Sequence, residues 1–158
     1  VLAGFANVQS PGRCEVLHRD PTIIIDAAHN PHGARAITET IQSEFTFDEV
    51  IGIFAAMGDK DVEGALVELE KVMDLIIVTK NSSQRSMPTA DVEAIAIKIF
   101  GAERVFTSET LEHAIEKAIK DSVRPLSEET IGILITGSVV TVGEARSIVR
   151  KRFAKESS

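Results

Sequence analysis

Five short apolar runs, separated by longer amphipathic stretches, constrain the fold of this chain more than any other feature. The runs are rich in Ile and Val, as strands buried on both faces of a parallel sheet are. They are Thr22–Ile25, Val50–Ala55, Leu75–Thr79, Arg104–Phe106 and Ile131–Thr136. Each is followed by a stretch with apolar residues at helical spacing. Five strand–helix units with right-handed crossovers predict an α/β fold, a three-layer, Rossmann-like arrangement with helices on both faces of a mostly parallel sheet.

A sixth strand is predicted at Cys14–His18. The turn after it, Arg19-Asp20-Pro21, is too short for a crossover, so this strand should pair antiparallel with the first parallel strand. The sheet should therefore have six strands, with one antiparallel strand at its edge. Residues 1–158 are enough for one domain. The chain begins with Val1 rather than Met, which predicts that it is a domain of a larger protein.

Composition argues against several classes of partner. The net charge of −7 and the absence of Tyr and Trp argue against nucleic acid, which needs basic density and stacking platforms. No apolar run reaches the ~18 residues of a membrane span, and no signal peptide is recognisable. The single cysteine, Cys14, fits a reducing compartment and excludes an internal disulfide. We expect a cytoplasmic monomer without nucleic-acid or membrane partners, in which Cys14 is not a nucleophile.

Polar segments follow the carboxyl ends of the predicted strands. These segments are Asp26–Asn30, Met57–Asp61, Asn81–Pro88 and Gly137–Ser138. The connections at the opposite edge of the sheet, such as residues 46–49 and 101–103, are short and plain. Ligands of open α/β sheets bind in a crevice at the carboxyl ends of the strands. We therefore expect the functional site at this edge.

The turn after the first parallel strand carries an acid, an imidazole and a helix start. The Asp26 carboxylate could accept hydrogen bonds from ribose hydroxyls, and we expect it to be exposed, so that its loss costs little stability. Asn30 is a predicted N-cap with Pro31 at the first helical position, and such an N-terminus suits an anion. His29 could donate to a phosphate or orient a nucleophile. The alternative is that Asp26 and Asn30 only cap the helix and His29 is an exposed turn residue.

Two basic side chains stand in polar turns. Arg13 follows Pro11-Gly12, so it leaves a rigid turn and could bind a phosphate or stack on a base. Lys60 lies between Asp59 and Asp61 and suits a carboxylate rather than a phosphate. The alternatives are a solvated loop arginine at Arg13 and, for the lysine, a helix start capped by one of the two aspartates.

Two further candidates follow later strands. Ser138 ends the last strand and opens the last helix, where its hydroxyl and free N–H groups could bind a carboxylate; the alternative is a helix N-cap. Arg85 lies in the polar loop Asn81–Pro88, where it is a candidate ligand or a solvated arginine.

Other sites are not recognisable in the sequence. Neither a G-x-G-x-x-G turn after the first strand nor a G-x-x-x-x-G-K-[ST] loop occurs. This chain alone can therefore contact only part of a bound nucleotide. His18, His32 and His113 lack partners at metal-ligand spacing, so we expect no metal site.

These motifs, taken in order, resemble a known family. They are Pro11-Gly12-Arg13, Asp26-Ala27-Ala28-His29-Asn30-Pro31, Asp59-Lys60-Asp61 and Gly137-Ser138. Over residues 4–152 the chain is similar to the C-terminal domain of folylpolyglutamate synthase/dihydrofolate synthase, of the Mur ligase superfamily. The cell-wall branch of that superfamily usually carries D-Y-A-H-T-P where this chain has Ala27 and Asn30.

The resemblance implies an ATP-dependent ligase that adds L-glutamate to dihydropteroate, to folates or to both through an acyl phosphate. It implies that the P-loop and most Mg²⁺ ligands belong to an N-terminal ATPase domain of the same polypeptide, so the isolated chain should be inactive. Arg13 and Asp26 would contact ATP, and His29 would act near the reacting phosphate. Lys60 and Ser138 would contact glutamate, and we extend that role to Arg85.

Two other interpretations of the sequence stay open. One is the C-terminal domain of a cell-wall Mur ligase. The other is a non-catalytic, flavodoxin-like binding module that binds a small anion or a partner protein. The sequence does not define the pteroate or folate acceptor, because the pterin site should lie mostly outside this chain.

Overall fold

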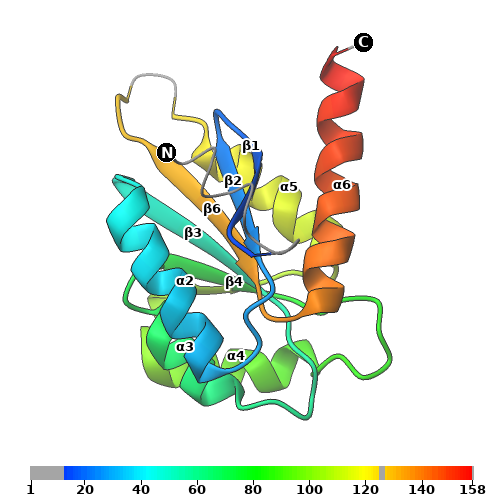
Figure 1. The fold of residues 1–158 in the computed structure, drawn as a ribbon. Coiled ribbons are helices and arrows are strands. Elements are labelled where there is room, and N and C mark those ends of the chain that lie inside the picture. The colour runs from blue at the N-terminus through cyan, green and yellow to red at the C-terminus, as the bar shows by residue number, and fades with distance from the viewer. Residues whose placement is uncertain (1–12, 125–126, 158) are drawn as a thin grey trace.

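The computed structural model describes residues 13–124 and 127–157 and shows three layers, a sheet between two sets of helices (Figure 1). Pro11 and Gly12 of the predicted turn lie outside the described residues. Six strands form one sheet in the order β1-β2-β6-β3-β4-β5. The strands are β1 Glu15–His18, β2 Thr22–Asp26, β3 Glu49–Phe54, β4 Leu75–Val78, β5 Val105–Thr107 and β6 Ile131–Thr136. All six predicted strands are confirmed.

The strand directions are also as predicted. β1 pairs antiparallel with β2, while every other neighbouring pair is parallel. β6 returns from the end of the chain and inserts between β2 and β3. Its last residue, Thr136, is in register with Asp26 on one side and Phe54 on the other. The carboxyl ends of these three strands are therefore level at one edge of the sheet.

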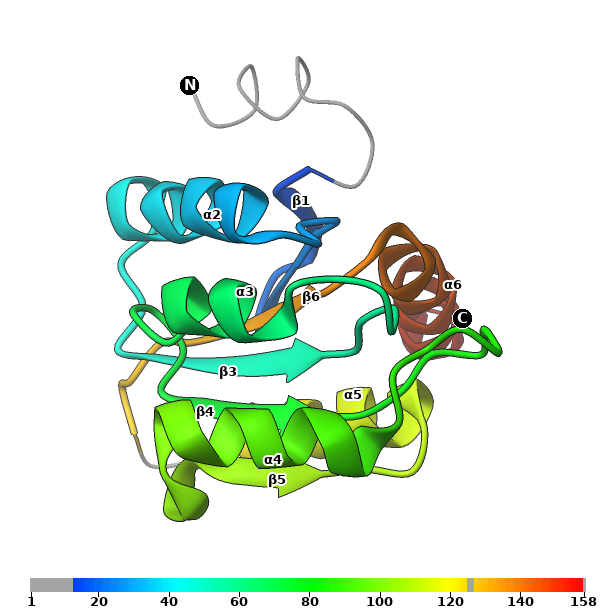
Figure 2. The same ribbon diagram turned by 90° about the horizontal axis from the view of Figure 1, so that it is seen from below.

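The helices divide between the two faces of the sheet. In Figure 2, α2 (Pro31–Glu44), α3 (Val62–Leu69) and α4 (Thr89–Phe100) lie in front of the sheet, and α5 (Leu111–Ser122) and α6 (Val139–Ser157) lie behind it. β2 and β6 are neighbours, but the chain leaves them toward opposite faces. That divergence is a topological switch point, the place where open α/β sheets form a crevice.

Two apolar cores, one on each face, hold the layers together. Along β2, Ile24 packs into the core beneath α2, α3 and α4, whereas Ile23 and Ile25 pack into the core beneath α5 and α6. All three side chains are fully buried. Burial on both faces explains why the strands are continuous apolar runs rather than alternating patterns. No helix over the described residues is long and apolar enough to cross a membrane.

Candidate functional site

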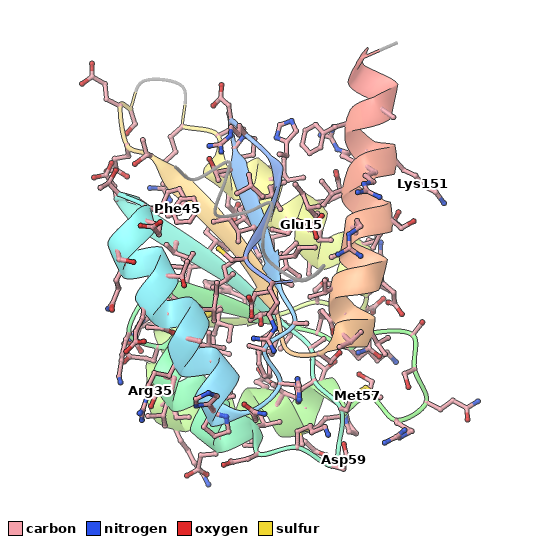
Figure 3. The ribbon with its side chains drawn as sticks, in the orientation of Figure 1. Glu15, Arg35, Phe45, Met57, Asp59 and Lys151 are labelled. Atoms are coloured by element: carbon pink, nitrogen blue, oxygen red, sulfur yellow. The ribbon has the colours of Figure 1, made fainter. Side chains whose placement is uncertain are left out.

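Four polar segments meet where the parallel strands end, and we call this region the carboxyl edge. It comprises residues 26–30 after β2, 55–61 after β3, 79–88 after β4 and 137–138 after β6. Figure 3 shows Met57 and Asp59 at this edge and Phe45 at the opposite one. The clustering of polar segments expected from the sequence is therefore present.

Asp26 ends β2 as a buried carboxylate. Its Oδ1 accepts the backbone N–H of Cys14 at 2.8 Å, and its Oδ2 accepts that of Ala28 at 3.0 Å. Burial raises the pKa of Asp26, although the two N–H donors and the nearby Arg13 offset part of the effect. The expectation of an exposed carboxylate is therefore wrong, because the Arg13–Cys14 segment folds over it. Each oxygen keeps a second lone pair, so the carboxylate can still accept a hydrogen bond from a hydroxyl group.

Asn30, not Asp26, caps α2. The Asn30 side chain accepts the backbone N–H of Gly33 at 2.8 Å, and Pro31 occupies the first turn, as predicted. His29 is half-buried in the same turn, and its Nδ1 lies 3.1 Å from the carbonyl oxygen of Ala27. Since a carbonyl only accepts, Nδ1 carries a proton. This leaves Nε2 as the ring nitrogen for a ligand.

The residues before β1 place a cation beside this turn. Arg13 is exposed and directly precedes Cys14, whose N–H is bonded to Asp26. Cys14 itself has a φ of 45° and is half-buried. Burial raises the pKa of the Cys14 thiol to about 11. The thiol is therefore protonated at neutral pH, which supports the prediction that it is not a nucleophile.

The loops after β3 and β4 are joined by backbone hydrogen bonds. The N–H of Gly58 donates to the carbonyl of Arg85, and the N–H of Met87 donates to that of Ala56, both at 2.8 Å. These bonds bring two cations predicted from different segments close together.

The two cations share one carboxylate. The Asp59 Oδ2 lies 3.9 Å from the Lys60 Nζ and 3.4 Å from an Arg85 guanidinium nitrogen. Both cations are exposed, so the pairs are weak and screened, and a ligand carboxylate can compete with Asp59. Asp61 caps α3 by accepting the N–H of Gly64 at 2.9 Å, as the alternative interpretation predicted.

Ser138 is buried, and its hydroxyl is committed to the protein. Its Oγ accepts the N–H of Thr141 at 3.0 Å and so caps α6, as the alternative interpretation predicted. The Thr141 hydroxyl donates to the carbonyl of Ala55 at 2.7 Å, so Ser138 is the donor in the 3.0 Å contact between the two hydroxyls. Asn81 donates to Ser138 Oγ at 3.4 Å. One donor and two acceptor positions of the Ser138 hydroxyl are thus filled.

Asn81 and Thr141, which bond to Ser138 and to each other, were not predicted as members of the site. Each had a weak signal: Asn81 stands just beyond the end of a strand, and Thr141 is the third residue after a predicted N-cap. Neither signal shows that the two side chains meet, because they are 60 residues apart in the chain.

Chemically, the carboxyl edge is suited to anions. Its exposed cations include Lys60, Lys80 and Arg85, and Arg13 lies beside the turn after β2. The N-termini of α2 and α6 add N–H groups that favour negative charge. Phosphates and carboxylates fit this donor set. In the described part of the chain, no group of three His, Cys, Asp or Glu side chains is arranged to hold a metal ion.

The profile of the Mur ligase glutamate ligase domain matches residues 12–139, which is most of the chain, and the chain belongs to that family. The dihydrofolate synthase/folylpolyglutamate synthase of Mycobacterium tuberculosis is 46% identical over 159 residues, covering 94% of this chain and 32% of that protein. A probable bifunctional folylpolyglutamate synthase/dihydropteroate synthase of Halobacterium salinarum is 32% identical over 155 residues, covering 98% of this chain and 18% of that protein.

Among solved structures, the Mycobacterium tuberculosis folylpolyglutamate synthase complexed with ADP and AMPPCP is 45% identical and superposes with a TM-score of 0.85. The match covers 93% of this chain and 34% of that chain. This chain therefore spans no more than about a third of the length of these relatives. The resemblance stated from the sequence motifs, and the fold that it implied, are confirmed.

Proposed function

We propose that this chain is the C-terminal domain of a larger, cytoplasmic and monomeric ATP-dependent ligase. The enzyme adds L-glutamate to dihydropteroate, to folates or to both through an acyl phosphate. One observation carries the proposal: Lys60 and Arg85 share the carboxylate of Asp59 at the carboxyl edge, in a domain of the glutamate ligase family. The names of the similar proteins support the folate branch.

The β2 side of the carboxyl edge is assigned to the nucleotide. Arg13 provides an exposed guanidinium for a phosphate or a base, and Asp26 provides free lone pairs for ribose hydroxyls. His29 presents Nε2 near the reacting phosphate, where it can hold or accept a proton. The phosphate loop and most Mg²⁺ ligands belong to the N-terminal ATPase domain, and bound Mg²⁺–ATP supplies the phosphoryl group that activates the acceptor carboxylate.

The β3–β4 side is assigned to glutamate. Lys60 and Arg85 provide charges for its two carboxylates, in place of their weak pairing with Asp59. Ser138 contributes the N-terminus of α6 rather than its hydroxyl, because the hydroxyl is already bonded on all sides. The amine of glutamate is then held for attack on the acyl phosphate.

The test is a ligation assay with the full-length ligase. ATP and glutamate are supplied with dihydropteroate, tetrahydrofolate or a UDP-muramoyl precursor, and ADP release and the ligated product are measured. We expect release of ADP only with the pteroate or folate acceptors. Activity confined to the UDP-muramoyl precursor would assign the chain to the cell-wall branch. Ligand binding without any ADP release would assign it to a non-catalytic binding module.

A further inference from the structure

Three buried polar side chains at the carboxyl edge, those of Asn81, Ser138 and Thr141, are used as ligands in none of the roles above. Asn81, Ser138 and Thr141 are 5%, 3% and 0% exposed, and they come from two segments that follow different strands. The Asn81 Nδ2 donates to the Thr141 Oγ1 at 3.0 Å and to the Ser138 Oγ at 3.4 Å. Because their polar groups are bonded to one another and to the backbone, they act on the site through the segments that they hold in place.

Asn81 joins three strand ends through this network. Thr141, which accepts from Asn81, donates to the carbonyl of Ala55 at the end of β3. Ser138 belongs to the turn that ends β6 and begins α6. Asn81 itself lies three residues beyond Val78, the last residue of β4. Every polar atom of the three side chains is satisfied, which favours a single arrangement of the segments.

The other end of the Asn81 side chain shapes the loop that carries Arg85. Its Oδ1 accepts the N–H of Ser83 at 3.0 Å, which fixes the first turn of residues 82–88. Ser82 is in turn held by α6, because its N–H lies 3.0 and 3.2 Å from the two carboxylate oxygens of Glu144. The backbone of Arg85 then reaches Gly58, beside Lys60.

We propose that Asn81 is a positioning residue for the amino-acid substrate: its amide fixes the Arg85 loop to the ends of β3 and β6, so that Lys60, Arg85 and the N-terminus of α6 are presented as one unit. This inference rests on the proposed function, because it takes glutamate as the ligand of that unit. Small displacements of substrate-positioning groups reduce activity steeply.

The first test uses Asn81→Ala and Thr141→Val in the full-length ligase, which break the network from its two ends. We expect the KM for glutamate to rise between about 10- and 100-fold in both, with the KM for ATP unchanged within about 2-fold. Asn81→Asp keeps the acceptor for Ser83 but removes the donors to Ser138 and Thr141, so it should behave similarly. It remains informative if Asn81→Ala does not fold.

The matched control is Thr38→Ala. Thr38 is also buried and donates to a backbone carbonyl, that of Glu68 at 3.1 Å, but this bond joins α2 to α3. It should lower stability and leave the KM for glutamate unchanged. An equal rise in that KM for Thr38→Ala would show that any loss of stability produces the effect and would overturn the inference.

A double-mutant cycle with Arg85→Ala separates positioning from general destabilisation. If Asn81 acts through the Arg85 loop, the two changes together should raise the KM for glutamate little more than the larger single change. Fully multiplicative effects would overturn the inference. Lys60→Met serves as the reference for the proposed function. If it raises the KM for glutamate and the Asn81 variants do not, only the positioning role fails; if it has no effect, the glutamate site itself is misplaced.

Discussion

Asp26 is both the last residue of a strand and a buried acceptor of two backbone N–H groups at the carboxyl edge. Its strand-end position marked it as a candidate in the sequence, and the structure places it beside Arg13. Its burial could not be predicted, because the N–H that covers it comes from Cys14, twelve residues upstream and in a left-handed backbone conformation. The apolar pattern that predicts a strand depends on the spacing of side chains. It does not predict the backbone conformation that brings the Cys14 N–H over Asp26.

Asp26→Ala in the full-length ligase should weaken the use of ATP and also destabilise the fold. A hydrogen bond to a charged group contributes about 1.5–3 kcal/mol, so the KM for ATP should rise about 10- to 150-fold. The N–H groups of Cys14 and Ala28 lose their acceptor, so the free energy of unfolding should fall by about 2 kcal/mol. Steady-state kinetics and chemical denaturation measure the two effects.

The control for this substitution is Asp48→Ala. Asp48 also accepts a backbone N–H, that of Thr130 at 2.8 Å, but at the opposite edge of the sheet. It should lower stability without changing the KM for ATP. If Asp26→Ala likewise changes only stability, Asp26 is a turn residue and not a nucleotide contact.

Cys14 should react slowly with alkylating reagents. Burial raises its pKa to about 11, so at pH 8 only about one thiol in a thousand is ionised, and the thiolate is the reactive form. The rate of reaction with iodoacetamide should therefore keep rising between pH 8 and 10, where an ordinary cysteine, with a pKa of about 8.5, approaches its plateau. A plateau by pH 9 in the folded protein would contradict this environment.

At the scale of elements, the sequence pattern was sufficient for the sheet and its helices. The five apolar runs placed the five parallel strands, because both faces of each central strand are covered. The short 3₁₀ helix Ala102–Arg104 was not predicted, since three residues carry no periodicity. The contact between the loops after β3 and β4 could not be predicted from the sequence pattern either. It depends on backbone hydrogen bonds such as that between Gly58 and Arg85.

The β6–α6 turn depends on a glycine at position 137. Gly137 has a φ of 125°, and a Cβ there would lie 2.2 Å from the carbonyl oxygen of Ala55. Gly137→Ala should therefore lower the free energy of unfolding by about 2–5 kcal/mol, from backbone strain and overpacking together.

The matched substitution is Gly143→Ala within α6, where a Cβ would meet no atom within 4 Å. It should raise the free energy of unfolding by about 0.5–1 kcal/mol, because alanine is the better helix former. Urea denaturation compares the two variants with the parent chain. Equal effects at the two positions would contradict the close approach at Ala55.

At the scale of the whole molecule, the described residues contain two complete apolar cores around one sheet, whereas the chain spans about a third of the length of its similar proteins. Residues 1–158 should therefore fold alone but not catalyse. We expect one cooperative unfolding transition by both calorimetry and circular dichroism, together with no ATP-dependent ligation of glutamate. Measurable ligation by this fragment would contradict the division of the site between two domains.

The most direct test of the central claim, that the carboxyl edge receives glutamate, is the kinetics of Lys60→Met in the full-length ligase with glutamate and ATP varied separately. The control is Lys98→Met, which removes an exposed charge from the last turn of α4. The loss of a charged hydrogen bond of about 1.5–3 kcal/mol should raise the KM for glutamate about 10- to 150-fold, with the KM for ATP unchanged and the control normal. A higher KM for ATP with that for glutamate unchanged would contradict the account.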